Sequence, residues 1–304
     1  MSNLLIVILG PTGIGKTEVA IKVATDLDTY IISADSRQVF MELNIGTAVP
    51  APSQLKKVKH YFIQHKSIHD YYSANIYEQE VISLLKKLFP VREKVVMTGG
   101  SGLYVDAVCE GIDDIPDVDP VIRRKVEEKL NSEGVSSLRN DLRLLDPESY
   151  KKVDLKNPKR IQRAVEICLS TGKPYSYFLT YKNKKRDFKV LKIGLTRERE
   201  ELYEIINKRV DKMVEAGLVE EARELYQYRG LNSLNTVGYN ELFDHFNGNI
   251  TLSNAIELIK RNTRRYAKRQ LTWFGKDKNI HWFEPSDVNN ILELVRNPQS
   301  TVGN

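Results

Sequence analysis

The sequence has few cysteines and no long apolar segment. Only two of its 304 residues are cysteines, Cys109 and Cys168, and they lie far apart without metal-ligand spacing. We therefore expect a reduced, cytoplasmic protein without a disulfide framework. The longest early apolar run, from Leu4 to Leu9, has six residues, whereas a membrane-spanning helix needs about 20. With 41% hydrophobic and 28% charged residues, the chain is expected to be globular rather than membrane-embedded.

Charge is unevenly distributed along the chain, although the net value is only +6. Residues 120–189 contain 18 basic and 9 acidic residues, and residues 260–278 contain 8 basic residues and 1 acidic residue. These two segments carry +9 and +7, so the remainder carries −10. Two basic segments on an acidic body favour a polyanionic partner larger than a metabolite, although solvated helix faces would give the same pattern.

Strands and helices alternate over most of the chain. Apolar runs predict buried strands at residues 4–9, 30–33, 94–97 and 190–195. Amphipathic segments predict helices at residues 17–27, 76–88, 197–216, 219–228 and 252–274. Between Pro120 and about Lys182 only helical patterns occur. We therefore predict an α/β fold, a P-loop-containing doubly wound parallel sheet formed by residues 1–119 and 190–304, with an inserted helical subdomain at residues 120–189.

The first predicted strand is followed by a glycine-rich phosphate-binding motif. The pattern G-x-x-x-x-G-K-[ST] is matched in full by Gly10, Pro11, Thr12, Gly13, Ile14, Gly15, Lys16 and Thr17. Backbone N–H groups of such a loop wrap a diphosphate or triphosphate, the Lys16 ammonium adds a positive charge, and the Thr17 hydroxyl can ligate Mg²⁺. The motif predicts a phosphate site without specifying a reaction.

The acid that nucleotide hydrolases place after a second apolar strand is missing. The strand at residues 94–97 is followed by Thr98-Gly99-Gly100, and no Asn-Lys-x-Asp element occurs. These absences disfavour a switch GTPase or an ATPase motor and leave a small-molecule kinase open. Asp35, at the tip of the second strand, is placed to act as a general base, or alternatively to cap the next turn. Ser101, in a second glycine-rich turn, could bind an anionic oxygen, or that turn could serve packing alone.

The helix predicted at residues 252–274 carries a broad basic stripe. Its basic residues recur in adjacent pairs every four positions: Lys260, Arg261, Arg264, Arg265, Lys268 and Arg269. The stripe favours contact with phosphate groups. Tyr266, Trp273 and Phe274 cover other positions of this helix and are expected in the core.

These motifs, in their order along the chain, resemble the bacterial tRNA dimethylallyltransferases, also called tRNA isopentenyltransferases. The resemblance spans nearly the whole chain and rests on residues 10–17, 33–39, 45–48, 72–74, 99–104, 160–166, 237–239 and 266–274. It implies a cytoplasmic, monomeric enzyme that transfers a dimethylallyl group from dimethylallyl diphosphate to the exocyclic amine of the adenosine 3′-adjacent to the tRNA anticodon (tRNA position 37). The products are isopentenyladenosine and pyrophosphate.

The resemblance also implies roles for individual residues. Asp35 accepts the amine proton, Arg209 lies near the pyrophosphate, and Ser101 stands where the family usually has Thr. Lys16, Mg²⁺ on Thr17 and the loop amides stabilise the departing pyrophosphate. The implied contacts with the tRNA anticodon stem-loop are Asp35, Ser36, Arg37, Gln38, Ser101, Arg123, Lys159, Arg160, Ile161, Gln162, Arg163, Asn235, Thr236, Val237, Gly238, Tyr239, Asn240, Lys268, Arg269, Gln270 and Trp273.

Two other activities stay open at this point. An adenylate isopentenyltransferase would use the same prenyl donor on a free nucleotide, and the two basic segments argue against it because AMP needs no such surface. A small-molecule P-loop kinase would bind ATP through the same loop.

Overall fold

The structure, a computed structural model that describes residues 3–180 and 184–298, contains a six-stranded sheet. Its strands are β1 (Leu4–Leu9), β2 (Ile31–Ser33), β3 (His60–Tyr61), β4 (Lys94–Gly99), β5 (Lys189–Leu195) and β6 (Ile280–Phe283). They are arranged in the order β3-β2-β4-β1-β5-β6, and each described pair of neighbouring strands is parallel. The predicted α/β fold with a parallel sheet is therefore confirmed.

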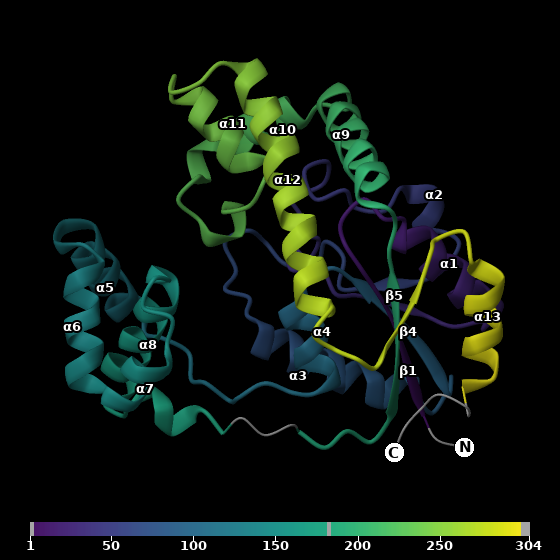
Figure 1. Cartoon of the computed structure of the whole chain (residues 1–304), viewed down its shortest axis with the longest axis horizontal. Coiled ribbons are helices and arrows are strands. Elements are labelled where there is room, and N and C mark those ends of the chain that lie inside the picture. The colour runs from purple at the N-terminus through teal and green to yellow at the C-terminus, as the bar shows by residue number, and fades with distance from the viewer. Residues whose placement is uncertain (1–2, 181–183, 299–304) are drawn as a thin grey trace. The chain divides into compact units, whose positions relative to one another are not determined.

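The central strand β1 is covered on both faces, which explains its unbroken apolar sequence. Leu4, Ile6 and Ile8 pack in one cluster with helix α1 (Lys16–Asp26) and helix α13 (Val288–Arg296). The alternate residues of β1 pack in a second cluster with helix α3 (Ala74–Leu88) and helix α4 (Gly102–Cys109). Figure 1 shows these two pairs of helices on opposite sides of the sheet.

The two edge strands were not predicted, and the reason is physical. β3 has two residues and both are only partly buried, while only one of the four residues of β6, Ile280, is fully buried. Neither strand therefore carries the continuous apolar run that marks a strand buried on both faces. The four predicted strands are all present, and β4 extends past the predicted Met97 to Gly99.

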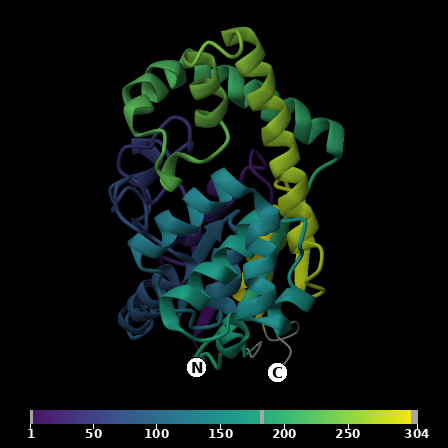
Figure 2. The ribbon, with the colours of Figure 1, turned by 90° about the vertical axis from the view of Figure 1, so that its left-hand side faces the viewer.

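A layer of helices extends from one end of the sheet. It comprises α9 (Arg199–Glu215), α10 (Leu218–Leu225), α11 (Tyr239–Phe246) and α12 (Leu252–Phe274). These helices share a hydrophobic cluster with Val39, Phe40 and Leu43, which follow β2. The bounds of α12 agree with the prediction, and Figure 2 shows this helix running from α11 down to the sheet. Helix α12 thus contributes to the hydrophobic cluster of these four helices and also to the core beside the sheet, where Phe274 is buried.

Residues 110–185 form a second compact unit, and residues 1–109 with 186–304 form the first. The second unit contains α5 (Pro120–Glu133), α6 (Val135–Leu145), α7 (Pro147–Lys152) and α8 (Pro158–Thr171) around its own apolar core. Both of its boundaries lie earlier than the predicted 120 and 189. The Lys184 N–H donates to the Glu110 carbonyl at 2.7 Å, and the Lys184 ammonium pairs with Asp114. The first and last parts of the segment 110–185 are therefore joined within this unit. Residues 181–183, within the predicted insertion at residues 120–189, lie outside the described residues.

Candidate active site

The phosphate-loop motif forms the connection between β1 and α1, as predicted. Gly15 immediately precedes α1 and has a φ angle of 98°, a left-handed conformation that residues with a side chain rarely adopt. Lys16 begins the helix, and its ammonium donates to the Pro11 carbonyl at 2.8 Å. The amides at the helix start and the positive end of the helix dipole make this loop suitable for an anion.

The strand order brings two further segments beside the loop. Because β4 lies between β1 and β2, the residues that follow all three strands meet at one edge of the sheet. The backbone joins them directly: the Ala34 N–H donates to the Thr98 carbonyl at 2.7 Å, and the Ser101 N–H donates to the Ala34 carbonyl at 3.2 Å. The Ser101 hydroxyl accepts a hydrogen bond from the Ser36 N–H at 3.0 Å.

Asp35 caps a turn and also lines a cavity. Its Oδ1 accepts hydrogen bonds from the N–H groups of Arg37 at 2.9 Å and Gln38 at 3.2 Å. The same side chain is part of the wall of a cavity of about 400 Å³ in the first unit. The capping interpretation left open by the sequence is therefore correct for one oxygen, and the same side chain also lines the cavity.

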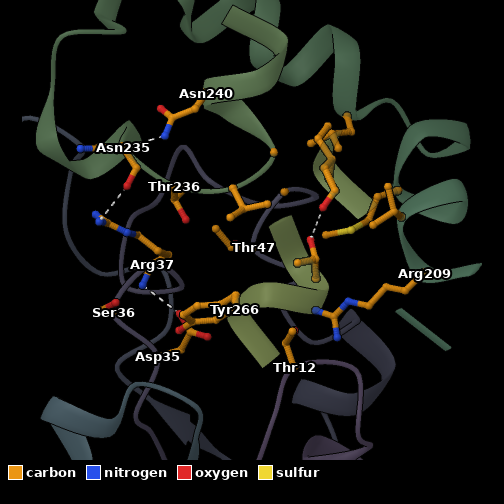
Figure 3. Close-up of a pocket in the computed structure, with 18 of the residues that line it drawn as sticks. Thr12, Asp35, Ser36, Arg37, Thr47, Arg209, Asn235, Thr236, Asn240 and Tyr266 are labelled. Atoms are coloured by element: carbon orange, nitrogen blue, oxygen red, sulfur yellow. Dashed lines mark hydrogen bonds between the residues drawn. The ribbon is translucent and has the colours of Figure 1, made fainter. Parts of the chain in front are cut away.

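The cavity combines charged, polar and apolar walls (Figure 3). Its charged and polar lining residues include Thr12, Asp35, Ser36, Arg37, Arg209, Tyr266 and Arg269. Its apolar lining residues include Val210, Met213, Leu218, Val237 and Ile259. Such a surface suits a ligand with an anionic end and a small hydrocarbon end.

The charges at this site favour an anion. The pKa of Lys16 is lowered to about 7, mainly by desolvation and then by the positive charge of Arg209, while the carboxylate of Asp35 opposes both effects. Burial also lowers the pKa of Arg209, again against the attraction of Asp35. Two desolvated cations thus share one nearby carboxylate, so a diphosphate would relieve an uncompensated positive charge.

Tyr266 lines the cavity, whereas the sequence pattern placed it in the core. Its hydroxyl lies beside Ser101, and its pKa is raised to about 12 by burial and by the negative charge of Asp35. Helical periodicity cannot separate a core position from a cavity wall, since both face inward. The one signal in the sequence that Tyr266 faces a polar site is its spacing from the polar residue Gln270, which lies four residues later and therefore on the same face of α12.

Several residues predicted to contact tRNA also hold the walls of the cavity together. The Arg37 guanidinium donates to the carbonyl groups of Asn232, Ser233 and Asn235, at 3.0 to 3.3 Å. Figure 3 shows the bond to Asn235. The Asn240 amide donates to the Asn235 side chain at 3.0 Å. Thr236, Val237 and Gly238 line the cavity between them. Arg37 therefore fixes the turn at residues 235–240 against the segment that follows β2.

Three predicted tRNA contacts have side chains that are buried in this structure. Ile161 and Tyr239 are 0% exposed, and Gln270 is 6% exposed. Ile161 belongs to the core of the second unit, and the Tyr239 hydroxyl donates to Glu221 at 2.6 Å. The side chains of these three residues therefore support their surroundings from inside, and their contact with RNA stays a prediction.

Other predicted contacts do lie at the surface. Lys268 and Arg269 are exposed on α12, and Lys159 and Arg160 are exposed on α8. Trp273 was expected in the core from the helical pattern, but it is 41% exposed and its indole N–H donates to Asp106 at 2.9 Å. Phe274 is buried as expected.

In the second unit, the buried carboxylate of Glu166 interacts with three of the residues predicted to contact tRNA. Glu166 accepts a hydrogen bond from the Gln162 amide at 2.8 Å, and the Arg123 Nε lies 3.9 Å from its other oxygen. Burial raises the pKa of Glu166, while the charges of Arg123 and Arg163 oppose that change. Arg163 also donates to the Pro116 carbonyl at 3.4 Å. Glu166 therefore orients these side chains on α5 and α8.

Sequence reasoning missed Glu221, which anchors a loop beside the cavity. One carboxylate oxygen accepts from the Gly46 N–H at 2.9 Å and the Tyr239 hydroxyl, and the other accepts from the Ile45 N–H at 2.7 Å. The carbonyl groups of Thr47 and Ala48 in the same loop accept from the Gln38 amide. The sequence carries no local signal for this role, because Glu221 lies on α10, far along the chain.

Replacing Glu221 is expected to destabilise this region. Glu221→Ala leaves three donors without their acceptor, and a lost hydrogen bond to a charged group costs about 1.5–3 kcal/mol. We therefore expect the free energy of unfolding, measured by chemical denaturation, to fall by about 2 kcal/mol or more. The neighbouring Glu220→Ala, at an exposed position, is the matched control. Equal stability of the two variants would contradict the anchoring role.

The described residues offer no preformed metal cluster and no membrane span. Within residues 3–180 and 184–298, no group of three or more His, Cys, Asp or Glu side chains is placed to hold a metal ion. In the same part of the chain, no helix has the length and apolarity needed to cross a membrane.

The parallel sheet, the phosphate loop and the carboxylate facing it define a P-loop α/β enzyme. A family model described as IPP transferase matches residues 38–277, and the chain belongs to this family. The chain is 54% identical to tRNA dimethylallyltransferase 1 of Bacteroides thetaiotaomicron, over 96% of this chain and 95% of that protein. It is also 54% identical to tRNA dimethylallyltransferase of Christiangramia forsetii, over 99% and 100% of the two chains.

Solved structures agree with this assignment. The full-length tRNA isopentenylpyrophosphate transferase of Bacillus halodurans is similar with a TM-score of 0.69 and 36% identity, covering 97% of this chain and 96% of that one. A eukaryotic dimethylallyltransferase acting on tRNA is similar with a TM-score of 0.78, over 99% of this chain and 81% of that one. At 24% identity, the second likeness concerns the fold alone.

Proposed function

We propose that this chain transfers the dimethylallyl group of dimethylallyl diphosphate to a tRNA, at the exocyclic amine of the adenosine immediately 3′ of the anticodon. The observation that carries the proposal is the meeting of Asp35 and Arg209 at one cavity, with Lys16 close enough for both charges to affect its pKa. Two cations suit a diphosphate, and one carboxylate suits a proton acceptor.

The proposed step forms one bond and breaks another. The amine nitrogen attacks the first carbon of the dimethylallyl group, the bond from that carbon to the diphosphate oxygen breaks, and pyrophosphate leaves. Asp35 takes the proton that the amine loses. Lys16, Arg209 and the loop amides stabilise the charge that develops on the leaving group. β4 ends in Thr98-Gly99 rather than in an acid, and this step needs none there, because no water is activated.

The residues present fit a magnesium ion shared with the diphosphate. Thr17, at the start of α1, offers a hydroxyl oxygen, the hard donor type that Mg²⁺ prefers. Mg²⁺ usually takes only one or two protein ligands and completes its shell with water and substrate phosphates, so a preformed acidic cluster is not required. When bound, the ion would neutralise charge on the pyrophosphate. We propose Thr17 as its protein ligand.

A matrix of donors and acceptors tests the activity. The protein is incubated with dimethylallyl diphosphate or ATP as donor, and with an anticodon stem-loop or AMP as acceptor. We expect isopentenyladenosine only from dimethylallyl diphosphate with the stem-loop, and none when guanosine replaces the target adenosine. Prenylated AMP would support an adenylate isopentenyltransferase instead, and phosphoryl transfer from ATP would support a kinase.

Binding of tRNA is expected to weaken steeply with salt, while binding of dimethylallyl diphosphate depends on Mg²⁺. Counterion release predicts a log–log slope of about −0.7 for each neutralised phosphate of a single strand. Lys268→Ala, at an exposed position on α12, should make the slope shallower by about one such unit. Fluorescence titrations at several salt concentrations measure both slopes. A flat salt profile would show that the basic segments do not bind tRNA.

A further inference from the structure

The amide of Gln270 is hydrogen-bonded at both ends inside the protein. Its Oε1 accepts from the Thr12 backbone N–H at 2.8 Å, and its Nε2 donates to the Gly100 carbonyl at 2.8 Å. The side chain is only 6% exposed. One residue of α12 thus joins the phosphate loop to the turn that carries Ser101.

The bond to Thr12 has a consequence for the loop. The Thr12 N–H is committed to the protein, so it is not among the amides that would wrap an anion. Without Gln270, the partly buried Thr12 N–H and the Gly100 carbonyl, whose bond to Gln270 is buried, would lose this partner, which is costly. The Gln270 side chain therefore gives both backbone groups a hydrogen-bond partner, and it also constrains the separation of the two glycine-rich segments.

We propose that Gln270 is a positioning residue for the diphosphate site: it holds the phosphate loop and the Ser101 turn at one fixed separation. This inference rests on the proposed function, since it takes a diphosphate as the ligand of the loop. α12 makes two further contacts around the same turn. The Tyr266 hydroxyl, one helical turn earlier, lies beside Ser101, and Trp273 donates to Asp106 on α4.

The local geometry around Gly100 allows a second, independent test of this role. A Cβ atom added at Gly100 would lie 2.2 Å from the Gln270 Nε2, and its next neighbours are no closer than 3.4 Å. Gly100→Ala should therefore displace the Gln270 amide and do little else. The absence of a side chain at Gly100 is what allows the amide to reach the backbone.

Gln270→Met tests the proposal, because it keeps the length of the side chain and removes both hydrogen bonds. We expect the Kd for pyrophosphate, measured by calorimetry with Mg²⁺, and the KM for dimethylallyl diphosphate to rise about ten-fold or more, since each unsatisfied buried group is costly. Affinity for tRNA should stay at the parental level. Gln79→Met, the same change at an exposed position of α3, is the matched control.

A double-mutant cycle separates positioning from general damage. Gly100→Ala and Gln270→Ala should each weaken pyrophosphate binding, and the double variant should be no weaker than Gln270→Ala alone. Additive losses, or parental pyrophosphate affinity in Gln270→Met, would overturn the proposal. So would a loss confined to tRNA affinity, which would place Gln270 on the RNA side. Should Gln270→Met fail to fold, the Gly100→Ala variant decides by the same measurement.

Pyrophosphate binding by the unmodified protein distinguishes failure of this inference from failure of the proposed function. If the unmodified chain binds no pyrophosphate in the presence of Mg²⁺, the proposed function fails, and the inference fails with it. If the parent binds and both variants bind equally well, only the role of Gln270 is overturned.

Discussion

Asp35→Asn is expected to lower the single-turnover rate of prenyl transfer by roughly 10²–10⁴-fold, the usual range for general-base assistance. An exocyclic amine is a poor nucleophile because its lone pair is delocalised into the purine ring. A carboxylate that accepts a hydrogen bond, and then the proton, makes attack on the allylic carbon easier. Rapid-quench measurements with enzyme in excess over tRNA give this rate directly.

The structure makes this substitution informative. Asn keeps an oxygen that can accept from the N–H groups of Arg37 and Gln38, so the turn after β2 should stay intact. Binding of tRNA and dimethylallyl diphosphate should therefore change little. Asp244→Asn, at an exposed position of α11, controls for the change of charge. A near-parental rate in Asp35→Asn would mean that this residue only caps the turn.

Lys16→Ala should weaken pyrophosphate binding by roughly 10²-fold, since removing one partner of a buried charge pair costs about 2–5 kcal/mol or more. The ammonium lies inside the phosphate loop, where desolvation and the charge of Arg209 lower its pKa to about 7 against the attraction of Asp35. Affinity for tRNA should be largely retained, because this charge is separate from the exposed basic residues of α12. Calorimetry with pyrophosphate and a filter-binding titration with tRNA measure the two affinities.

Arg160→Ala provides the opposite pattern for comparison. This residue is exposed on α8 in the second unit, so its loss should weaken tRNA binding and leave pyrophosphate binding at the parental level. Parallel losses of both affinities in Lys16→Ala would instead indicate unfolding or a single merged site, which thermal denaturation distinguishes.

Much of the site could be predicted because it follows buried strands. The apolar run of β1 and the eight residues after it specify a strand, a loop and a helix without knowledge of the rest of the fold. The contact between the segments carrying Asp35 and Ser101 could not be predicted in this way. It depends on β4 lying between β1 and β2, and strand order is a property of the whole sheet.

The sequence could not predict the roles of Tyr266, Gln270 and Glu221 for a related reason. Each was compatible with a simpler interpretation: a core aromatic, an RNA contact and a charged residue on an amphipathic helix. Burial and hydrogen-bond partners distinguish these possibilities, and both depend on elements distant in sequence. Gln270, for example, bonds to a loop residue 258 positions away.

The position of β1 also sets an order of events during synthesis of the chain. β1 pairs on one side with β4 and on the other with β5, where Leu4 lies opposite Lys189. The second neighbour of the strand that leads into the phosphate loop therefore emerges from the ribosome only after the whole of residues 110–185. That helical unit has a core of its own and largely local contacts, which form quickly. It can fold while the sheet is still open, so the phosphate loop is among the last parts of the enzyme to be completed.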